Sequence, residues 1–315
     1  MPIEPANRGS IARAAAILRS GSLVAVPTET VYGLAANAAD DRAVAGIFAA
    51  KERPRFNPLI IHVRDLEHAQ TLAAFTNPAR RLAEAFWPGP LTLVLPRRTQ
   101  APVSLLATAG LDTIAVRVPA HETARLLLEE SQLAIAAPSA NRSGHISSTT
   151  AAHVAESFGT AVELILDAGP AQHGIESTIV GLYEAGPVLL RPGALPREDI
   201  AAVVGPLHAY EGGAVASPGR LRSHYSPKTP LRLNARDVGP NEALLAFGTP
   251  PMHAPAMRNL SEAGELREAA ANLFAMLHEL DRSGAATIAV MPIPEHGLGE
   301  AINDRLRRAA APKDA

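Results

Sequence analysis

Positively charged residues gather in one short segment, residues 51–58, with the sequence KERPRFNP. Lys51, Arg53 and Arg55 are three cations within five positions, at the expected end of a helix. The two prolines stiffen the segment and so reduce the entropy lost when charged groups are held in place. Arg53 could bind phosphate oxygens in bidentate fashion, and Lys51 could act as a point charge. The alternative is that these cations are solvated at a helix C-terminus, where the macrodipole favours them.

Two further polar segments follow apolar runs that are typical of buried strands. Residues 27–33 read PTETVYG, and residues 137–144 read APSANRSG. Side chains at the carboxyl ends of strands are well placed to contact a ligand in an open α/β sheet. The alternative for the first segment is a turn rich in threonine, with Glu29 at the start of a helix. The alternative for the second is a loop without a chemical role.

Single polar residues also lie inside apolar strands. His62 is within IIHV and Arg117 within AVRV. A histidine there is usually a core side chain with satisfied hydrogen bonds, whereas a buried guanidinium needs an anionic partner. The sequence leaves two candidates for the partner of Arg117, an internal carboxylate or the carboxylate of a substrate. Arg191 in LLRPG and Ser177 in GIESTIV are likewise polar groups at strand ends.

Alternating short strands and helices must position these residues between about residues 10 and 200. The pattern predicts a helix over residues 11–19 that ends at Gly21, and a second over residues 43–50 that starts at Asp40 and Asp41. Strands are predicted over residues 23–26, 59–63, 91–95, 114–118, 134–137, 164–167, 177–182 and 188–190. Because helical stretches separate some of these strands and tight turns separate others, we expect a mixed sheet.

Glycine, proline and serine concentrate between residues 205 and 230, which indicates a linker. Beyond it, the pattern predicts strands over residues 242–247 and 287–291 and helices over residues 266–280 and 300–308. We therefore expect a large α/β domain over residues 8–204, a linker over residues 205–230 and a smaller α/β domain over residues 231–315.

Composition excludes several classes of protein. The 315 residues are 47% hydrophobic and 4% aromatic, with a net charge of −2, which argues against disorder and against a surface built wholly to bind nucleic acid. Without cysteine, disulfides, thiolate metal sites and cysteine nucleophiles are excluded. No signal peptide and no apolar run of about 18 residues is apparent, so we expect a cytoplasmic protein that does not enter the membrane.

Eight segments together resemble the threonylcarbamoyl-AMP synthase family in its long form, which joins a YrdC-like domain to an extra C-terminal domain. In chain order they are PTETVYGLA, KERPRFNPL, WPGPLTLVL, AVRVPAH, APSANRSG, GIESTIV, LLRPG and SPGRLRSHYSPKTP. EALLAFG and TIAVMPIPEHGLGEAINDRL extend the resemblance toward the end of the chain. The resemblance implies an α/β fold: a YrdC-like twisted mixed sheet with helices, and a smaller Rossmann-like C-terminal domain.

The resemblance also implies which residues carry the chemistry. The family's KxR signature falls on Lys51 and Arg53, which are implied to be catalytic, and its SxN signature falls on Ser139 and Asn141. The implied contacts to L-threonine are Thr30, His62, Arg117, Ala137 and Ser177. The implied contacts to ATP are Lys51, Arg53, Asn57, Thr113, Ser139, Asn141, Ser147, Arg191, His224 and Tyr225. The linker is implied to close over the cavity as a lid, although Arg220 stands where many relatives have a methionine.

The implied activity is that of an L-threonylcarbamoyladenylate synthase, a nucleotidyltransferase. L-Threonine captures bicarbonate or CO₂ as a carbamate, which attacks the α-phosphate of ATP; the product serves N6-threonylcarbamoyladenosine formation in tRNA. Mg²⁺ would arrive with the ATP phosphates, and no separate metal site is expected. The product would be handed to a tRNA threonylcarbamoyl-transferase complex, with a weak tRNA contact as a further implied interaction. The alternative is an RNA-binding YrdC-like module without synthase activity.

Overall fold

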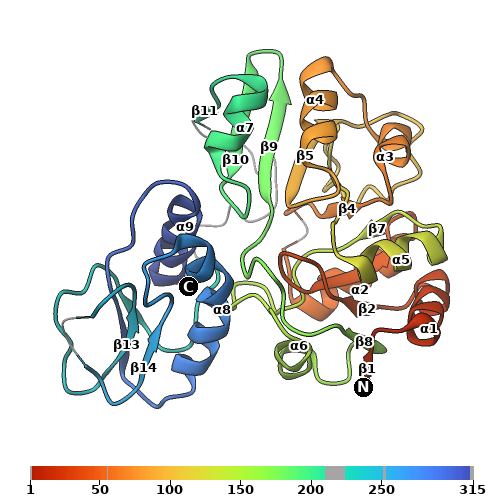
Figure 1. The fold of residues 1–315 in the computed structure, drawn as a ribbon. Coiled ribbons are helices and arrows are strands. Elements are labelled where there is room, and N and C mark those ends of the chain that lie inside the picture. The colour runs from red at the N-terminus through yellow and green to blue at the C-terminus, as the bar shows by residue number, and fades with distance from the viewer. Residues whose placement is uncertain (1, 55, 210–223, 251–252, 313–315) are drawn as a thin grey trace.

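The computed structural model describes residues 2–54, 56–209, 224–250 and 253–312, and it shows two α/β units. The larger unit is coloured red to green in Figure 1 and the smaller one cyan to blue. The predicted lid falls mainly on residues 210–223, which lie outside the described residues. The last part of the predicted linker, from His224 onward, is described and packs between the two units.

The sheet of the larger unit is mixed, as predicted, because β4 (Ile60–His62) pairs with β6 (Thr113–Arg117) in parallel and β6 pairs with β5 (Leu91–Pro96) in antiparallel fashion. In the described part of the chain it has eleven strands. Their spatial order is β1 (Ile3–Pro5), β8 (Leu164–Asp167), β2 (Val24–Val26), β3 (Gly33–Asn37), β7 (Ile135–Ala136), β4 (Ile60–His62), β6 (Thr113–Arg117), β5 (Leu91–Pro96), β9 (Thr178–Tyr183), β10 (Gly186–Arg191) and β11 (His208–Ala209).

Helices surround this sheet, and two of them match the predicted helices closely. The helices of the larger unit are α1 (Arg8–Arg19), α2 (Asp41–Lys51), α3 (Leu66–Leu72), α4 (Asn77–Phe86), α5 (Glu122–Ser131), α6 (Ala151–Phe158) and α7 (Arg197–Val204). The side chain of Asp40 accepts hydrogen bonds from the backbone N–H groups of Arg42 and Ala43, which confirms the predicted start of α2. The helix ends at Glu52, which adopts a left-handed conformation with φ of 53°.

The segment after Thr28 is not helical, so the alternative that Glu29 begins a helix was wrong. Residues 27–32 form an irregular loop, and β3 follows directly and pairs with β2 and β7. The strand β3 was not predicted, because its residues, GLAAN, have little intrinsic preference for a strand. Its pairing with two buried neighbours, together with burial of Leu34, Ala35 and Ala36, decides the conformation.

In its described residues, the smaller unit is a four-stranded parallel sheet with two helices, which agrees with the predicted Rossmann-like α/β class. Its elements are β12 (Leu231–Arg232), β15 (Thr287–Val290), β13 (Glu242–Ala246), β14 (Met257–Asn259), α8 (Leu266–Asp281) and α9 (Leu298–Ala310). Leu273, Phe274 and Leu277 on α8 are buried in its core.

One buried apolar cluster joins the two units. Ile146, Ile175 and Tyr225 belong to the same buried cluster as Phe274 of α8. At Gly174 a Cβ atom would lie 2.3 Å from a backbone oxygen of α8, so only glycine permits this close approach. The predicted domain boundaries remain predictions. None of the helices in the described residues combines the length and the apolar character that a membrane crossing requires.

Candidate active site

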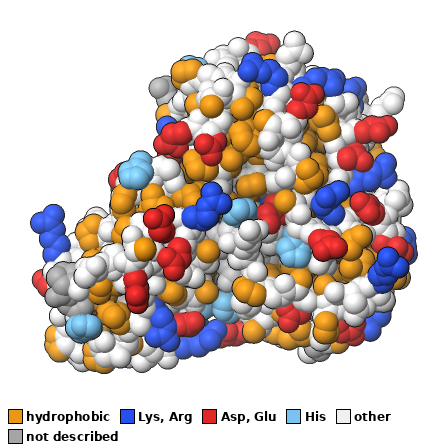
Figure 2. Space-filling view, in the orientation of Figure 1, with side chains coloured by type: hydrophobic (Ala, Val, Ile, Leu, Met, Phe, Trp, Pro, Cys, Tyr) orange, Lys and Arg blue, Asp and Glu red, His pale blue; other side chains and the backbone are white. Residues whose placement is uncertain are grey.

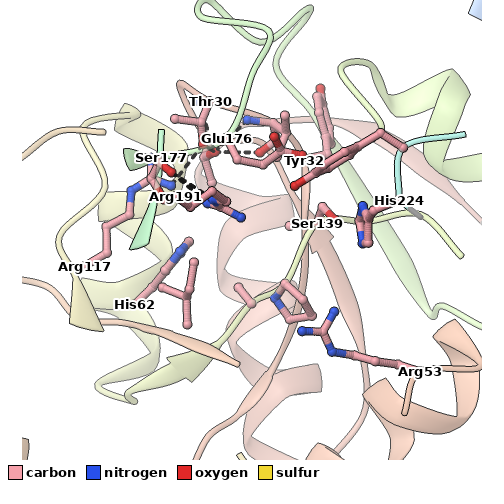
Figure 3. A pocket seen from close by; sticks show the side chains of 17 residues that line it. Thr30, Tyr32, Arg53, His62, Arg117, Ser139, Glu176, Ser177, Arg191 and His224 are labelled. Atoms are coloured by element: carbon pink, nitrogen blue, oxygen red, sulfur yellow. Dashed lines mark hydrogen bonds between the residues drawn. The ribbon is translucent and has the colours of Figure 1, made fainter. Parts of the chain in front are cut away.

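A cavity of about 540 Å³, counting the space at its open mouth, lies where several strands of the larger sheet end. It brings together ten of the residues proposed from sequence: Thr30, Arg53, His62, Arg117, Ala137, Ser139, Ser177, Arg191, His224 and Tyr225. His62 and Arg117 lie toward one side, Arg53, Ser139 and His224 toward the other, and Arg191 between them (Figure 3). We refer to these two sides as the Arg117 end and the Arg53 end.

At the Arg117 end, the buried arginine is already paired within the protein. Arg117 Nη2 lies 2.6 Å from Glu29 Oε1, so the internal carboxylate is one of the two partners that the sequence left open. Arg117 Nη1 donates a hydrogen bond to Thr30 Oγ1 (3.0 Å), and Nε donates to the carbonyl of Gly89 (3.1 Å). Burial alone would raise the pKa of Glu29, but the adjacent guanidinium outweighs this effect and lowers it. Glu29 therefore stays ionised and fixes the orientation of Arg117.

His62 lies beside this ion pair at the end of β4 and is 5% exposed. Burial and the positive charge of Arg117 lower its pKa to about 3, although Glu29 opposes the shift. The imidazole is therefore neutral near pH 7. This end of the cavity thus carries one ion pair and a neutral ring, with little net charge.

The Arg53 end has no comparable pairing. Arg53 donates from Nε to the carbonyl of Asn57 (3.3 Å) and from Nη2 to that of Pro58 (3.0 Å), and within the described residues it has no acidic partner. Burial lowers its pKa to about 10, which still leaves the guanidinium charged at neutral pH. A buried, charged group held only by carbonyl groups is costly unless an anion joins it.

Arg191 is a second buried cation without an ion pair in the described part of the chain. Its Nη2 donates to the backbone carbonyl of Ser177 (2.7 Å) and to Ser177 Oγ (3.2 Å). Ser177 Oγ also lies 2.8 Å from Thr92 Oγ1 on β5. Close packing supports this arrangement, because a Cβ atom at Gly193 would lie 2.4 Å from the backbone of Glu176. Arg191 therefore lies between the two ends of the cavity and is held there by Ser177.

Lys51 does not line the cavity but braces its wall. Its side chain is 1% exposed, and Nζ donates hydrogen bonds to the carbonyls of Ser139 (2.6 Å) and Asn141. Burial, with Arg53 nearby, moves the pKa of Lys51 well below its ordinary value. The KxR and SxN signatures are thus in direct contact, because the lysine of the first holds the loop of the second.

The other four predicted residues that do not line the cavity are Asn57, Thr113, Asn141 and Ser147. Asn141 Nδ2 donates to the carbonyls of Arg142 and His145, and Ser147 Oγ donates to Glu176. Thr113 begins β6, at the end of that strand opposite to Arg117. Asn57 is fully buried, and both polar atoms of its amide lack a hydrogen-bond partner among the described residues. Such a group in a native structure calls for an unseen partner.

Two adjacent residues from the end of the linker complete the wall. The rings of His224 and Tyr225 have centroids 4.1 Å apart, and Tyr225 also stacks on Phe274 of α8. Burial and the surrounding cations move the pKa of His224 well below its ordinary value, so this ring is neutral. His224 Nδ1 and Tyr225 Oη are buried without a hydrogen-bond partner in the described residues. His224 and Tyr225 thus bring to the cavity polar atoms that have no protein partner in the described residues.

Glu176 is a charged cavity residue that was not predicted from sequence, although it lies within the GIESTIV segment. Its carboxylate is held by Ser147 and by Arg305 of α9, a contact that only the tertiary structure creates. The other lining residues that were not named individually are Thr28, Val31, Tyr32, Gly33, Ile60 and Pro138. No group of three or more potential metal ligands occurs among the described residues.

Comparisons with known proteins cover nearly the whole chain. A family model described as "Telomere recombination" matches residues 16–193, and one described as "Threonylcarbamoyl-AMP synthase, C-terminal domain" matches residues 195–311. Threonylcarbamoyl-AMP synthase of Pyrococcus abyssi is 44% identical, with 94% of this chain and 93% of that protein covered. The Bacillus subtilis protein of the same name is 39% identical, with 96% and 94% covered. The crystal structure of P. abyssi Sua5 complexed with L-threonine superposes with a TM-score of 0.90, at 42% identity and with 98% and 96% of the two chains covered.

Proposed function

The chain belongs to the long form of the threonylcarbamoyl-AMP synthase family, and we propose that its cavity joins L-threonine, bicarbonate or CO₂, and ATP into threonylcarbamoyl-AMP. One feature of the geometry supports this proposal most directly. A single cavity holds a paired arginine at one end and arginines without acidic partners toward the other. The first environment suits a small zwitterion, and the second suits a polyphosphate.

L-Threonine occupies the Arg117 end in this proposal. A guanidinium has five N–H donors, and the contacts of Arg117 with Glu29, Thr30 and Gly89 leave donors free for the carboxylate of threonine. Thr30, His62 and Ser177 offer polar atoms around it, and Ala137 also lines the cavity, although its backbone N–H already donates to the carbonyl of Ile60 (3.0 Å). Because His62 is neutral, it can accept or donate a hydrogen bond without adding charge.

ATP occupies the Arg53 end. Arg53 and Arg191 bind phosphate oxygens, and their buried position strengthens this attraction relative to water. Ser139, His224 and Tyr225 line the same space. Lys51 acts through the loop that it holds, and the predicted contacts of Asn57, Thr113, Asn141 and Ser147 with ATP remain part of the proposal.

The reaction needs no nucleophile from the protein. The amine of threonine adds to the carbon of CO₂ to give a carbamate; starting from bicarbonate, one water is released. A carbamate oxygen then forms a bond to the α-phosphorus of ATP, and the bond to the bridging oxygen of pyrophosphate breaks. The transfer of AMP to the carbamate makes the enzyme a nucleotidyltransferase. The cavity contributes alignment and charge neutralisation.

Mg²⁺ is proposed to enter with the ATP phosphates. Glu176 lines the cavity and pairs with Arg305, and Glu29 pairs with the lining residue Arg117, so neither offers a free carboxylate. Phosphate oxygens and water are the ligands that Mg²⁺ prefers in such sites. The product is a mixed anhydride that water hydrolyses, which favours direct hand-over to a tRNA threonylcarbamoyl-transferase complex, with a weak tRNA contact as part of the same proposal.

The test is pyrophosphate and threonylcarbamoyl-AMP formation with L-threonine or bicarbonate omitted in turn. The wild-type chain should require both, and Arg53→Ala should lower product formation at subsaturating ATP by about 100-fold or more, as expected for loss of a charged contact to phosphate. Arg142→Ala is the matched control, because Arg142 is a cation on a neighbouring loop whose side chain is 52% exposed and pairs with Glu52.

Pyrophosphate release that ignores threonine would overturn the substrate assignment. A chain that consumes no ATP under any condition, yet binds RNA in a salt-dependent manner, would favour the RNA-binding alternative. Figure 2 shows acidic and basic side chains interspersed over the face of the molecule that it displays. A surface that binds nucleic acid would instead carry a cluster of basic side chains.

A further inference from the structure

Arg305 lies on α9 of the smaller unit, yet its side chain ends against the wall of the cavity in the larger unit. It is fully buried and is the largest side chain in the described residues that is so completely enclosed. It does not itself line the cavity. Burial of a guanidinium is unfavourable unless its donors are well satisfied, so the surroundings of Arg305 indicate what it does.

Each major contact of Arg305 is made to a part of the cavity wall. Nε donates to Glu176 Oε2 (2.8 Å), and Nη2 donates to the carbonyl of Pro192 (3.0 Å), the residue after Arg191. The guanidinium carbon lies 4.9 Å from the centre of the Tyr225 ring. Nη1 is held by Asp304, the preceding residue on α9 (2.5 Å). One side chain therefore contacts three segments that carry cavity residues.

Glu176 is the contact with an electrostatic consequence. Its carboxylate lines the cavity and is 6% exposed, and its second oxygen accepts a hydrogen bond from Ser147 Oγ (2.5 Å). Burial would favour the protonated acid, but the charges of Arg305 and Arg191, together with the hydrogen bonds from Ser147 and Arg305, outweigh it and lower the pKa of Glu176. An ionised carboxylate at this position would repel a polyphosphate if no cation neutralised it.

We infer that Arg305 is a positioning residue through which the smaller unit completes the nucleotide side of the cavity. It neutralises Glu176, and it holds the segments that carry Ser177 and Arg191 in place. This inference rests on the proposed function, since it concerns the ATP that the cavity takes. It assigns a task in the synthase reaction to the C-terminal unit, beyond support of the linker.

Another ion pair between α9 and the larger unit provides a matched comparison. Arg197 of α7 pairs with Glu300 of α9, but its side chain is 41% exposed and neither residue lines the cavity. If Arg305 only joined the two units, its removal would lower stability without a selective effect on the KM for ATP. If it acts on Glu176, only its removal should affect ATP.

The experiment compares full-length Arg305→Met, Glu176→Gln, the double variant and Arg197→Ala. Arg305→Met should raise the KM for ATP by about 10- to 100-fold, the range expected when a buried charge loses its partner, with a smaller change in the KM for threonine. The double variant should recover at least about tenfold of that loss, because the uncompensated carboxylate is gone. Arg197→Ala should stay within about twofold of the wild type.

Rescue by Glu176→Gln is the decisive result, because a merely structural role would not produce it. An unchanged KM for ATP in Arg305→Met, or a folded double variant no better than the single one, would overturn the inference. If Arg305→Met does not fold, Arg305→Lys is tested in its place. This variant keeps the positive charge and should keep most of the affinity for ATP. A loss of ATP affinity as large as that in Arg53→Ala would overturn the inference. A wild-type chain that makes no threonylcarbamoyl-AMP would instead refute the proposed function.

Discussion

Arg117 and Arg53 are buried arginines of one cavity, and they differ in what holds them. Arg117 pairs with Glu29 at 2.6 Å, beside a neutral His62. Arg53 donates only to backbone carbonyls in the described part of the chain, close to the buried polar atoms of His224 and Tyr225 that lack partners. The protein therefore neutralises one end by itself and leaves the other to a ligand.

This difference matches what each end is proposed to bind. A paired arginine is fixed in orientation and can align a small carboxylate, but it attracts anions weakly because its charge is cancelled. An unpaired buried cation attracts a polyanion strongly, since little water screens the interaction. Alignment is thus assigned to the threonine end and attraction to the ATP end.

The largest expected effect comes from removing Arg117. Arg117→Met should raise the KM for threonine by about 100-fold or more, the loss expected for a charged bidentate contact, while the KM for ATP changes by a few fold at most. Steady-state kinetics with each substrate varied would measure the split. Arg53→Met should give the reverse pattern.

Arg117→Met also leaves Glu29 buried without its cation, which could impair folding for reasons unrelated to threonine. The double variant Glu29→Gln/Arg117→Met removes both charges and should fold while still lacking threonine affinity. Normal threonine affinity in this double variant would contradict the assignment of the Arg117 end.

A smaller effect concerns the neutral state of His62 and appears in stability. The pKa of His62 is about 3 in the folded chain and about 6.5 in the unfolded chain. Below about pH 6.5, His62 takes up a proton in the unfolded chain but not in the folded chain. The free energy of unfolding therefore has its full value above that pH and falls as the pH drops toward 3. The loss at pH 5 should be about 2 kcal/mol from this residue alone.

Urea unfolding of the wild type and of His62→Gln at pH 7 and pH 5 would measure this contribution. The variant cannot titrate at this position. Relative to the variant, the wild type should therefore lose about 2 kcal/mol of unfolding free energy between pH 7 and pH 5. Parallel pH dependences would show that His62 keeps its ordinary pKa in the folded chain, and the Arg117 end would then gain a positive charge below about pH 6.5.

The smallest expected effect is that of salt. Raising NaCl from about 0.05 M to about 0.5 M should raise the KM for ATP about threefold and leave that for threonine nearly unchanged, because only the Arg53 end relies on net charge to attract its substrate. At fixed free Mg²⁺, Arg53→Ala should show a weaker salt dependence. An equal response of both KM values would remove the electrostatic distinction between the ends.

Much of the fold could be predicted from local sequence, because it depends on local signals. Asp40 marks the start of α2, and apolar runs mark β4, β5 and β6. The strand β3 was missed, since its small residues are held extended by pairing with β2 and β7 and not by their own preference. Where distant pairing outweighs propensity, a local pattern cannot give the answer.

The sequence by itself determined the membership of the cavity to a large degree. The order and spacing of the motifs made five segments recognisable, those that contain Thr30, Arg53, Arg117, Ser139 and Arg191. The structure gathers these five residues around one cavity. Their identities fix what chemistry is available, since hydroxyl, amide and guanidinium groups carry their properties wherever the chain places them.

Only the tertiary structure decided which of these groups are already satisfied. Glu29 and Arg117 lie 88 positions apart in sequence, and Glu176 and Arg305 lie 129 apart, so neither ion pair has a local signal. Lys51 likewise turned toward loop carbonyls because the fold brings residues 139–141 to the end of α2. Charge, burial and hydrogen bonding depend on neighbours in space, and these set the pKa values and the electrostatic difference between the two ends of the cavity.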